Sequence, residues 1–335
     1  MPRPLLHITL LCCLLMAACS GAGEESGNAT AEERPPKQIY LTFSGGPVGG
    51  TFNLYASRIA SIVSNTCRNI DVTPQGSGGS ADNLSALTSG RTDMGLVYSG
   101  DAYLALKARG GKPAPFLAAA RLYGADAQLV VPARSGIRSL DDLRGLTVAV
   151  GNPGSGAALS AERFLTRLGL WKDLKVVTLG YSAASAKLLA GEVDAFWVLS
   201  STSNPAVANA ARKMPIRLLP LRAPAEAGGF FDTYPFYTPA EIPAHTYPGQ
   251  DEPVPTFQDA ALWCVRKDLA PATVVSSLEA VFSDEGLERL RTAHSSTREV
   301  SLSTGGTRLS VPLHPGAKSF WRERGYEYRD ADGKP

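Results

Sequence analysis

Three glycine- and serine-rich loops carry the clearest chemistry in this 335-residue sequence. They span residues 44–51, 72–80 and 148–156, and each separates a short apolar run from a segment with helical periodicity. The first backbone N–H groups of a helix have no partner inside the helix, and the helix dipole places partial positive charge there. Glycine lets a ligand approach the backbone closely. The loops therefore predict one site for a small anionic solute, the alternative being that they are only tight strand-to-helix turns.

The candidate contacts are backbone N–H groups, hydroxyls and an amide at the ends of these loops and of neighbouring strands. We predict that the solute is bound by the following positions: Ser44, Gly50, Thr51, Ser80, Asn83, Tyr98, Ser99, Tyr123, Gly154, Ser155, Gly156 and Ser182. Two of them have an ordinary structural alternative. Ser80 could simply be the N-cap of the helix that follows it, and Tyr98 could belong to the core.

Other classes of function find little support in the sequence. No loop combines G-x-G-x-x-G with an acidic residue about 20 positions later, and no phosphate-binding G-x-x-x-x-G-K-[ST] is present. Serines are abundant, but no set of serine, histidine and acid stands out as a nucleophile with its base. The net charge of +2 does not favour nucleic acid as a partner. We therefore expect a binding protein without catalysis, metal or cofactor.

The first residues form a targeting segment. Arg3 precedes the short apolar run 5–15, which is too short to span a bilayer, and small residues stand directly before Cys19. This pattern resembles a bacterial lipobox and predicts a signal peptide over residues 1–18 with Cys19 lipidated; a plain secretory signal is the alternative. Residues 19–37 are rich in Gly, Glu, Ser and Pro and predict a disordered tether. Both alternatives place the protein outside the cytoplasm, and lipidation would anchor it to a membrane.

Two cysteines remain in the predicted mature domain, Cys67 and Cys264. An exported pair can oxidise, so a disulfide between them is possible. Buried free thiols are equally compatible with the sequence.

Apolar runs alternate with amphipathic segments along most of the chain. Between residues 39 and 107 the order is strand, helix, strand, helix, strand, helix, which predicts a parallel sheet covered by helices. Strands are expected at 116–122 and 128–132, and a second alternation at 147–220. Six prolines between 230 and 255 predict an irregular segment. In sheets of this kind ligands bind beyond the carboxyl ends of the strands, where the three loops would lie.

A series of short motifs resembles the TAXI family, the solute receptors of one branch of the TRAP transporters. Besides the loop 44–51, the motifs are Gly79-Ser80-Ala81-Asp82-Asn83-Leu84, Gly90-Arg91-Thr92-Asp93-Met94-Gly95, Leu140-Asp141-Asp142-Leu143-Arg144-Gly145, Gly151 to Gly156, Gly191-Glu192-Val193-Asp194-Ala195, Ile242-Pro243-Ala244-His245 and Val311-Pro312-Leu313-His314-Pro315. They are spread from residue 39 to about residue 328. We read His245 and His314 within them as structural residues.

The resemblance implies an α/β fold of the two-lobed periplasmic-binding-protein type (type II-like), with mixed sheets flanked by helices. Lobe 1 would comprise residues 38–130 plus 256–330, lobe 2 would comprise residues 131–255, and crossing strands would form the hinge. The implied function is capture of a small carboxylate, an amino acid or a dicarboxylate, for an ion-gradient-driven TRAP permease. The implied protein is monomeric and anchored by lipid. The alternative is a ligand-sensing receptor that acts with a membrane sensor kinase.

The sequence departs from the family pattern at positions where ligand contacts are expected. Tyr98-Ser99 stands where the family usually has glutamine before serine, and Ala157 replaces a threonine. Tyr123-Gly124-Ala125 replaces the usual Tyr-Pro-Glu. These changes exchange an amide for a phenol and remove a hydroxyl, so the solute of this chain is not fixed by the resemblance.

Overall fold

The structure is a computed structural model that describes residues 37–47, 50–292, 295–307 and 309–326. The predicted signal peptide (1–18), Cys19 and all of the predicted tether except Lys37 lie outside the described residues. Within the described ranges, no helix combines the length and apolar character that crossing a membrane requires.

The first part of the chain forms the predicted strand–helix alternation. Its elements are β1 (Ile39–Ser44), α1 (Thr51–Thr66), β2 (Ile70–Gln75), α2 (Ser80–Ser89), β3 (Met94–Tyr98) and α3 (Ser99–Lys107). Strand β1 pairs in parallel with both β2 and β3. Alternation along the strand explains its placement, because Leu41 and Phe43 are buried, whereas Tyr40, next to Leu41, is 76% exposed.

A second alternation follows, as the sequence predicts. Its elements are η1 (Asp141–Leu143), β5 (Thr147–Ala149), α4 (Gly156–Arg167), η2 (Trp171–Asp173), β6 (Lys175–Val177), α5 (Tyr181–Leu189), β7 (Ala195–Ser200), α6 (Pro205–Lys213), β8 (Ile216–Leu218), α7 (Arg222–Ala227), α8 (Phe230–Thr233) and β9 (Thr238–Ile242). Strand β5 pairs in parallel with β6 and β7. The segment 230–255 is more regular than predicted, because α8, β9 and the start of the strand β10 (Val254–Arg266) lie within it.

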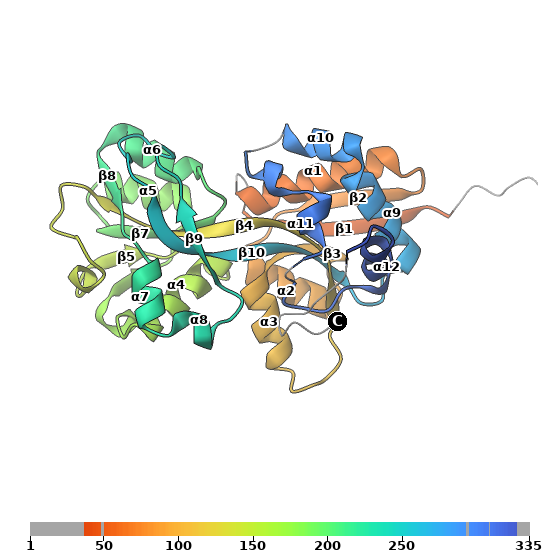
Figure 1. The fold of residues 1–335 in the computed structure, drawn as a ribbon, viewed down its shortest axis with the longest axis horizontal. Helices are drawn as coiled ribbons and strands as arrows, with labels where there is room; N and C mark the ends of the chain where they lie inside the picture. The colour runs from red at the N-terminus through yellow and green to blue at the C-terminus, as the bar shows by residue number, and fades with distance from the viewer. Residues whose placement is uncertain (1–36, 48–49, 293–294, 308, 327–335) are drawn as a thin grey trace, which may run out of the picture. The chain divides into compact units, whose positions relative to one another are not determined.

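Two long strands, β4 (Phe116–Pro132) and β10 (Val254–Arg266), connect these alternations (Figure 1). The sequence predicts separate strands at 116–122 and 128–132, but the structure joins them into one. Strand β10 pairs with β9 through its first part and with β3 through its second part. Strand β4 pairs with β10 up to Asp126 and with β7 from Asp126 onward. The result is a single ten-stranded mixed sheet with the path β2-β1-β3-β10-β4-β7-β5-β6.

The C-terminal helices pack on the β1–β3 side. They are α9 (Pro271–Phe282), α10 (Asp284–Arg291), η3 (Ser295–Glu299), α11 (Leu302–Gly305) and α12 (Pro315–Glu323). The indole N–H of Trp321 donates to the carbonyl of Ala119 in β4 at 2.9 Å. His314 is fully buried and caps α12, its Nδ1 accepting from the N–H of Gly316 at 3.2 Å. This agrees with a structural role for His314.

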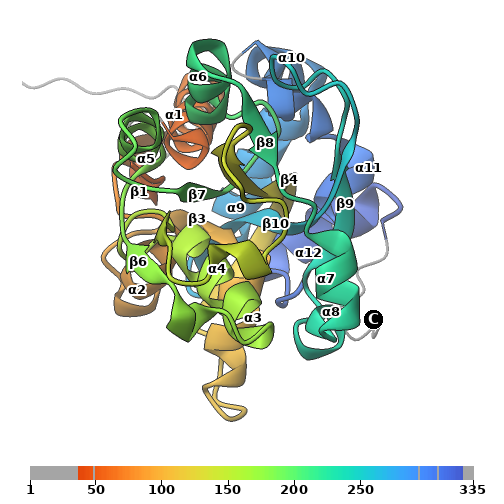
Figure 2. The same ribbon diagram turned by 90° about the vertical axis from the view of Figure 1, so that its left-hand side faces the viewer.

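Side chains of β7 point alternately into two apolar clusters. Trp197 packs with Phe164 of α4 in the larger cluster, which also fills the β1–β3 side. Phe196 and Val198 face α5 and α6 in the smaller one. Figure 2 shows α4 on one side of β7 and the pair α5 and α6 on the other. The near-continuous apolar run of β7 therefore reflects burial on both faces.

The possible disulfide between Cys67 and Cys264 is not formed, and both residues are free thiols. Cys264 is fully buried within β10. Cys67 ends α1, and its thiol donates to the carbonyl of Ser276 in α9 at 3.6 Å. The two cysteines thus serve different packing contacts, and burial raises the pKa of both thiols, that of Cys264 to about 12.

Candidate functional site

A cavity of about 450 Å³ lies where five helices begin. The helix starts contribute Gly50, Thr51 and Phe52 of α1, Gly79 and Ser80 of α2, Ser155, Gly156 and Ala157 of α4, Gly180, Tyr181, Ser182 and Ala183 of α5, and Asn204, Pro205 and Ala206 of α6. Pro47, Gly78, Tyr98, Asn152, Leu199 and Ser200 complete the lining. The volume lies in the range of small-molecule sites.

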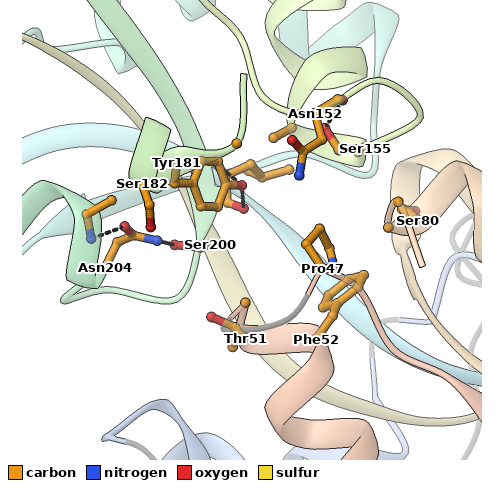
Figure 3. Close-up of a pocket in the computed structure, with 18 of the residues that line it drawn as sticks. Pro47, Thr51, Phe52, Ser80, Asn152, Ser155, Tyr181, Ser182, Ser200 and Asn204 are labelled. Carbon is orange, nitrogen blue, oxygen red and sulfur yellow. Dashed lines mark hydrogen bonds between the residues drawn. The ribbon is translucent and has the colours of Figure 1, made fainter. Parts of the chain in front are cut away.

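The topology explains why the five helix starts meet. Each of these helices follows a strand of its own alternation, and the parallel strands end at a common edge of the sheet. Figure 3 shows Thr51, Phe52 and Ser80 across the cavity from Asn152, Tyr181 and Ser182. The cavity is thus lined by residues from both alternations.

The five helix starts differ in whether a side chain already occupies their N–H groups. Ser155 caps α4 by accepting from the N–H of Ala158 at 3.2 Å, and Asn204 caps α6 by accepting from the N–H of Ala206 at 2.9 Å. The N-caps of α1, α2 and α5 are the glycines Gly50, Gly79 and Gly180, without a side-chain cap. In α2 the N–H of Ala81 donates to the carbonyl of Gly154 at 3.2 Å. The starts of α1 and α5 therefore offer the most available donors.

Seven of the twelve predicted contact residues line the cavity: Gly50, Thr51, Ser80, Tyr98, Ser155, Gly156 and Ser182. All three predicted loops contribute to it. Ser80 is the first residue of α2, and Gly79 is its N-cap. The Ser80 hydroxyl accepts from the N–H of Tyr98 at 2.9 Å, so it holds the end of β3 beside the cavity.

The other five predicted contact residues do not line the cavity: Ser44, Asn83, Ser99, Tyr123 and Gly154. The Asn83 amide donates to the carbonyls of Gly45 at 2.5 Å and Leu96 at 2.7 Å, so it holds the first loop in place without contacting the cavity. The Ser99 hydroxyl donates to that of Ser310 at 2.5 Å. Tyr123 is fully buried and stacks on Tyr55 with ring centroids 4.8 Å apart. These side chains support the site without facing it.

Sequence reasoning passed over most of the lining supplied by α5 and α6. Gly180 stands directly before the helix that begins at Tyr181, in the same strand–glycine–helix order as the predicted loops, which is a signal that could have found it. Asn204-Pro205 is an N-cap followed by proline at the first helical position. Ser200 carries no comparable local signal, since only the pairing of β7 brings it to the cavity.

Tyr98 links the two alternations beside the cavity. Its hydroxyl donates to the carbonyl of Leu199 in β7 at 2.7 Å, and the Tyr181 hydroxyl donates to the same carbonyl at 2.8 Å. The Tyr98 ring lies 4.7 Å from that of Phe52 and directly against Gly156. Burial raises the pKa of both phenols, so they are neutral hydrogen-bond donors at physiological pH.

A buried ion pair joins α3 to α4 next to this contact. The Arg163 guanidinium lies 2.7 Å from the Asp101 carboxylate, and their side chains are 14% and 2% exposed. Arg163 also donates to the Tyr237 hydroxyl at 3.2 Å. The nearby Asp259 accepts from the N–H of Gly100 at 3.2 Å, and burial, together with repulsion from Asp101, raises the pKa of Asp259 well above its ordinary value. One arginine thus serves a cluster that contains two carboxyl groups.

Asp126 is a further buried acid, at the point where β4 passes from β10 to β7. Its Oδ2 accepts from the Thr202 hydroxyl at 2.5 Å. Burial raises the pKa of Asp126 from 3.8 to about 7; the Thr202 hydrogen bond opposes this shift and the charge of Glu299 adds to it. Between these values the folded protein holds a proton that the unfolded chain has lost, so folding stability falls as pH rises from about 4 to about 7.

We expect Asp126→Asn to be more stable than the parent at pH 8, by up to roughly 4 kcal/mol for a shift of this size. The asparagine Oδ1 can still accept from Thr202, and no charge has to be buried. The advantage should shrink to near zero at pH 4.5, because Asp126 is then largely protonated in the folded state. Urea unfolding of both proteins across this pH range measures the difference, and an advantage that does not vary with pH would contradict the assignment.

The fold is that of the periplasmic solute-binding proteins. The chain belongs to the NMT1-like family, whose model matches residues 43–325. A solved structure from Bordetella bronchiseptica RB50 is similar at 18% identity and a TM-score of 0.52, covering 78% of this chain and 77% of that one. An L-cystine ABC transporter protein from Listeria monocytogenes is similar at 13% identity and a TM-score of 0.51, covering 76% and 95%. The alkanesulfonate-binding protein SsuA from Xanthomonas axonopodis pv. citri matches at 16% identity and a TM-score of 0.46, covering 86% and 85%.

Proposed function

We propose that this protein is an extracytoplasmic solute-binding protein that captures a small carboxylate for a membrane transporter. The observation that carries the proposal is the cavity of about 450 Å³ between the uncapped starts of α1 and α5. N–H groups at a helix start bind an anion through hydrogen bonds and through the helix dipole. The hydroxyls of Thr51 and Ser182 add donors on the same two helices. Capture therefore requires no basic side chain.

The proposal includes two lobes that close around the solute, with β4 and β10 as the hinge. Lobe 1 would comprise residues 38–130 plus 256–330, and lobe 2 would comprise residues 131–255. The change of pairing partner within both strands supports this division. Closure would bring the starts of α1 and α5 onto the solute together and exclude water from it. An open form would then admit and release the solute.

The transporter that we propose is an ion-gradient-driven TRAP permease, and the anchor is a lipid on Cys19. The motifs shared with TAXI receptors support this assignment. The alternative is a receptor that signals to a sensor kinase. It is kept open because Ser20, rather than the aspartate that often retains lipoproteins in the inner membrane, follows Cys19. Neighbouring genes for a many-helix permease, for the ATPase of an ABC importer or for a histidine kinase discriminate these partners.

Thr51→Pro tests capture by backbone N–H groups. Thr51 is the first residue of α1, and Gly50 before it has φ −84° and ψ 158°, the extended conformation that a following proline requires. Proline there keeps the helix but removes one N–H and the hydroxyl, so we expect binding of the carboxylate to weaken about tenfold or more. Isothermal titration with the acids that raise the melting temperature of the parent protein measures the change.

Thr51→Val is the matched control, because it removes the hydroxyl and keeps the N–H. It should weaken binding less than Thr51→Pro does. Equal losses in the two variants would assign the effect to the hydroxyl and contradict capture by the helix start. If no carboxylate in a broad panel binds the parent protein, the proposed function itself is wrong.

A further inference from the structure

The residues that line the cavity carry no carboxylate and no cationic side chain among the described positions. The described lining consists of glycines, hydroxyl and amide side chains, aromatic rings and small apolar groups. Val48 and Gly49 of the loop 44–51 lie outside the described ranges, and neither residue type carries a charge. The electrostatic potential in the cavity is therefore set mainly by the helix starts, which carry partial positive charge.

Three carboxylates in this part of the fold already have hydrogen-bond or ion-pair partners. Asp82 accepts from the N–H of Gly78 at 2.9 Å, Asp101 pairs with Arg163, and Asp126 accepts from Thr202. None of the three lines the cavity. A positively charged group on the solute would consequently find no anionic partner there.

Backbone carbonyls cannot take the place of these carboxylates. At a helix start the N–H groups point outward and the carbonyls point into the helix, as in α5, where the Gly180 carbonyl accepts from the N–H of Ala184. The Asn152 carbonyl accepts from both the N–H and the hydroxyl of Ser155. The Leu199 carbonyl already accepts from two tyrosine hydroxyls. Among these backbone groups, the N–H donors at the helix starts are therefore more available to a solute than the carbonyl acceptors.

We infer that the solute is an acid without an amino group, that is, an unsubstituted, hydroxy or oxo carboxylate rather than an amino acid. This inference rests on the proposed function and narrows its solute class. An ammonium group in this cavity loses its water, gains no counter-charge and faces the positive ends of helices. A hydroxyl or oxo group at the same carbon carries no net charge and meets donors that an oxygen can accept from.

Matched solutes that differ at one carbon test the inference. Isothermal titration of the mature protein, without the predicted signal peptide, measures the affinity for each solute. It compares L-glutamate with 2-hydroxyglutarate and glutarate, and L-phenylalanine with phenyllactate and 3-phenylpropionate. We expect at least one acid without the amino group to bind about 30-fold or more tightly than its amino acid. Amino acids that bind as tightly as their counterparts would overturn the inference and leave the proposed function standing. Binding of no acid at all would overturn both.

Asn152→Asp supplies a second readout. Figure 3 shows the Asn152 side chain directed into the cavity, and aspartate has nearly the same shape. The new carboxylate should weaken binding of the preferred acid about tenfold or more and reduce its preference over the matched amino acid. Asn65→Asp makes the same change of charge at an exposed position of α1 and should alter neither value. An unchanged preference in Asn152→Asp would mean that lining charge does not set selectivity.

Discussion

Replacement of Arg163 by methionine should lower the free energy of unfolding by about 3–5 kcal/mol. The Asp101 side chain is 2% exposed, and Arg163 is its cationic partner at 2.7 Å. Methionine fills much of the same volume but leaves the Asp101 carboxylate beside Asp259 without a positive charge. The destabilisation arises mainly from this uncompensated buried charge, since the pair itself contributes less than its desolvation suggests.

Urea unfolding at pH 7 measures the effect of Arg163→Met. Arg163→Lys keeps the positive charge and should lose less stability. The double variant Asp101→Asn with Arg163→Met removes both charges, so it should be more stable than Arg163→Met alone. A loss below about 1 kcal/mol in Arg163→Met would show that water or Tyr237 compensates Asp101, contrary to this account.

Gly156→Ala should weaken solute binding about 100-fold, because the two alternations meet at this glycine. A Cβ at position 156 would lie 2.2 Å from the Tyr98 ring and 2.7 Å from the Asp101 carboxylate. Alanine otherwise suits the first turn of a helix, so α4 itself should not suffer. The protein can relieve this steric clash by moving Tyr98 away from α4, and that movement opens the cavity between the proposed lobes.

The control for Gly156→Ala is Gly136→Ala, because a Cβ at position 136 meets nothing within 4 Å. It should leave binding unchanged. Adding Tyr98→Ala to Gly156→Ala removes the ring that the new methyl strikes, and small-angle scattering should then show a more compact protein than Gly156→Ala alone. Wild-type affinity in Gly156→Ala would show that Tyr98 can shift without opening the site, and would argue against closure as the source of affinity.

The local sequence determined most of the architecture. Strand, glycine-rich turn and helix recur often enough to predict two α/β alternations, and the observed elements follow them closely in type and order. The reason is that apolar residues recur every second position in a strand and about every 3.6 positions in a helix, and both patterns can be recognised within a short stretch of sequence. The merging of β4 was not predictable from this level, because 123–127 carries no strand pattern of its own and is ordered by pairing with β10.

The tertiary structure decided which loop residues face the cavity. The sequence by itself predicted that several helix starts would meet at one edge of the sheet, because glycine- and serine-rich loops there join strands to the helices that follow them. It could not show that the Ser155 hydroxyl caps α4 or that the Asn83 amide donates to a carbonyl of the first loop. Nor could it show that α5, across the cavity from α1, has no side-chain cap. Nor could it place Tyr98 on the carbonyl of Leu199, 101 residues away. Such contacts join residues that only the completed sheet brings together, and they decide the donors, the charge and the volume that a solute meets.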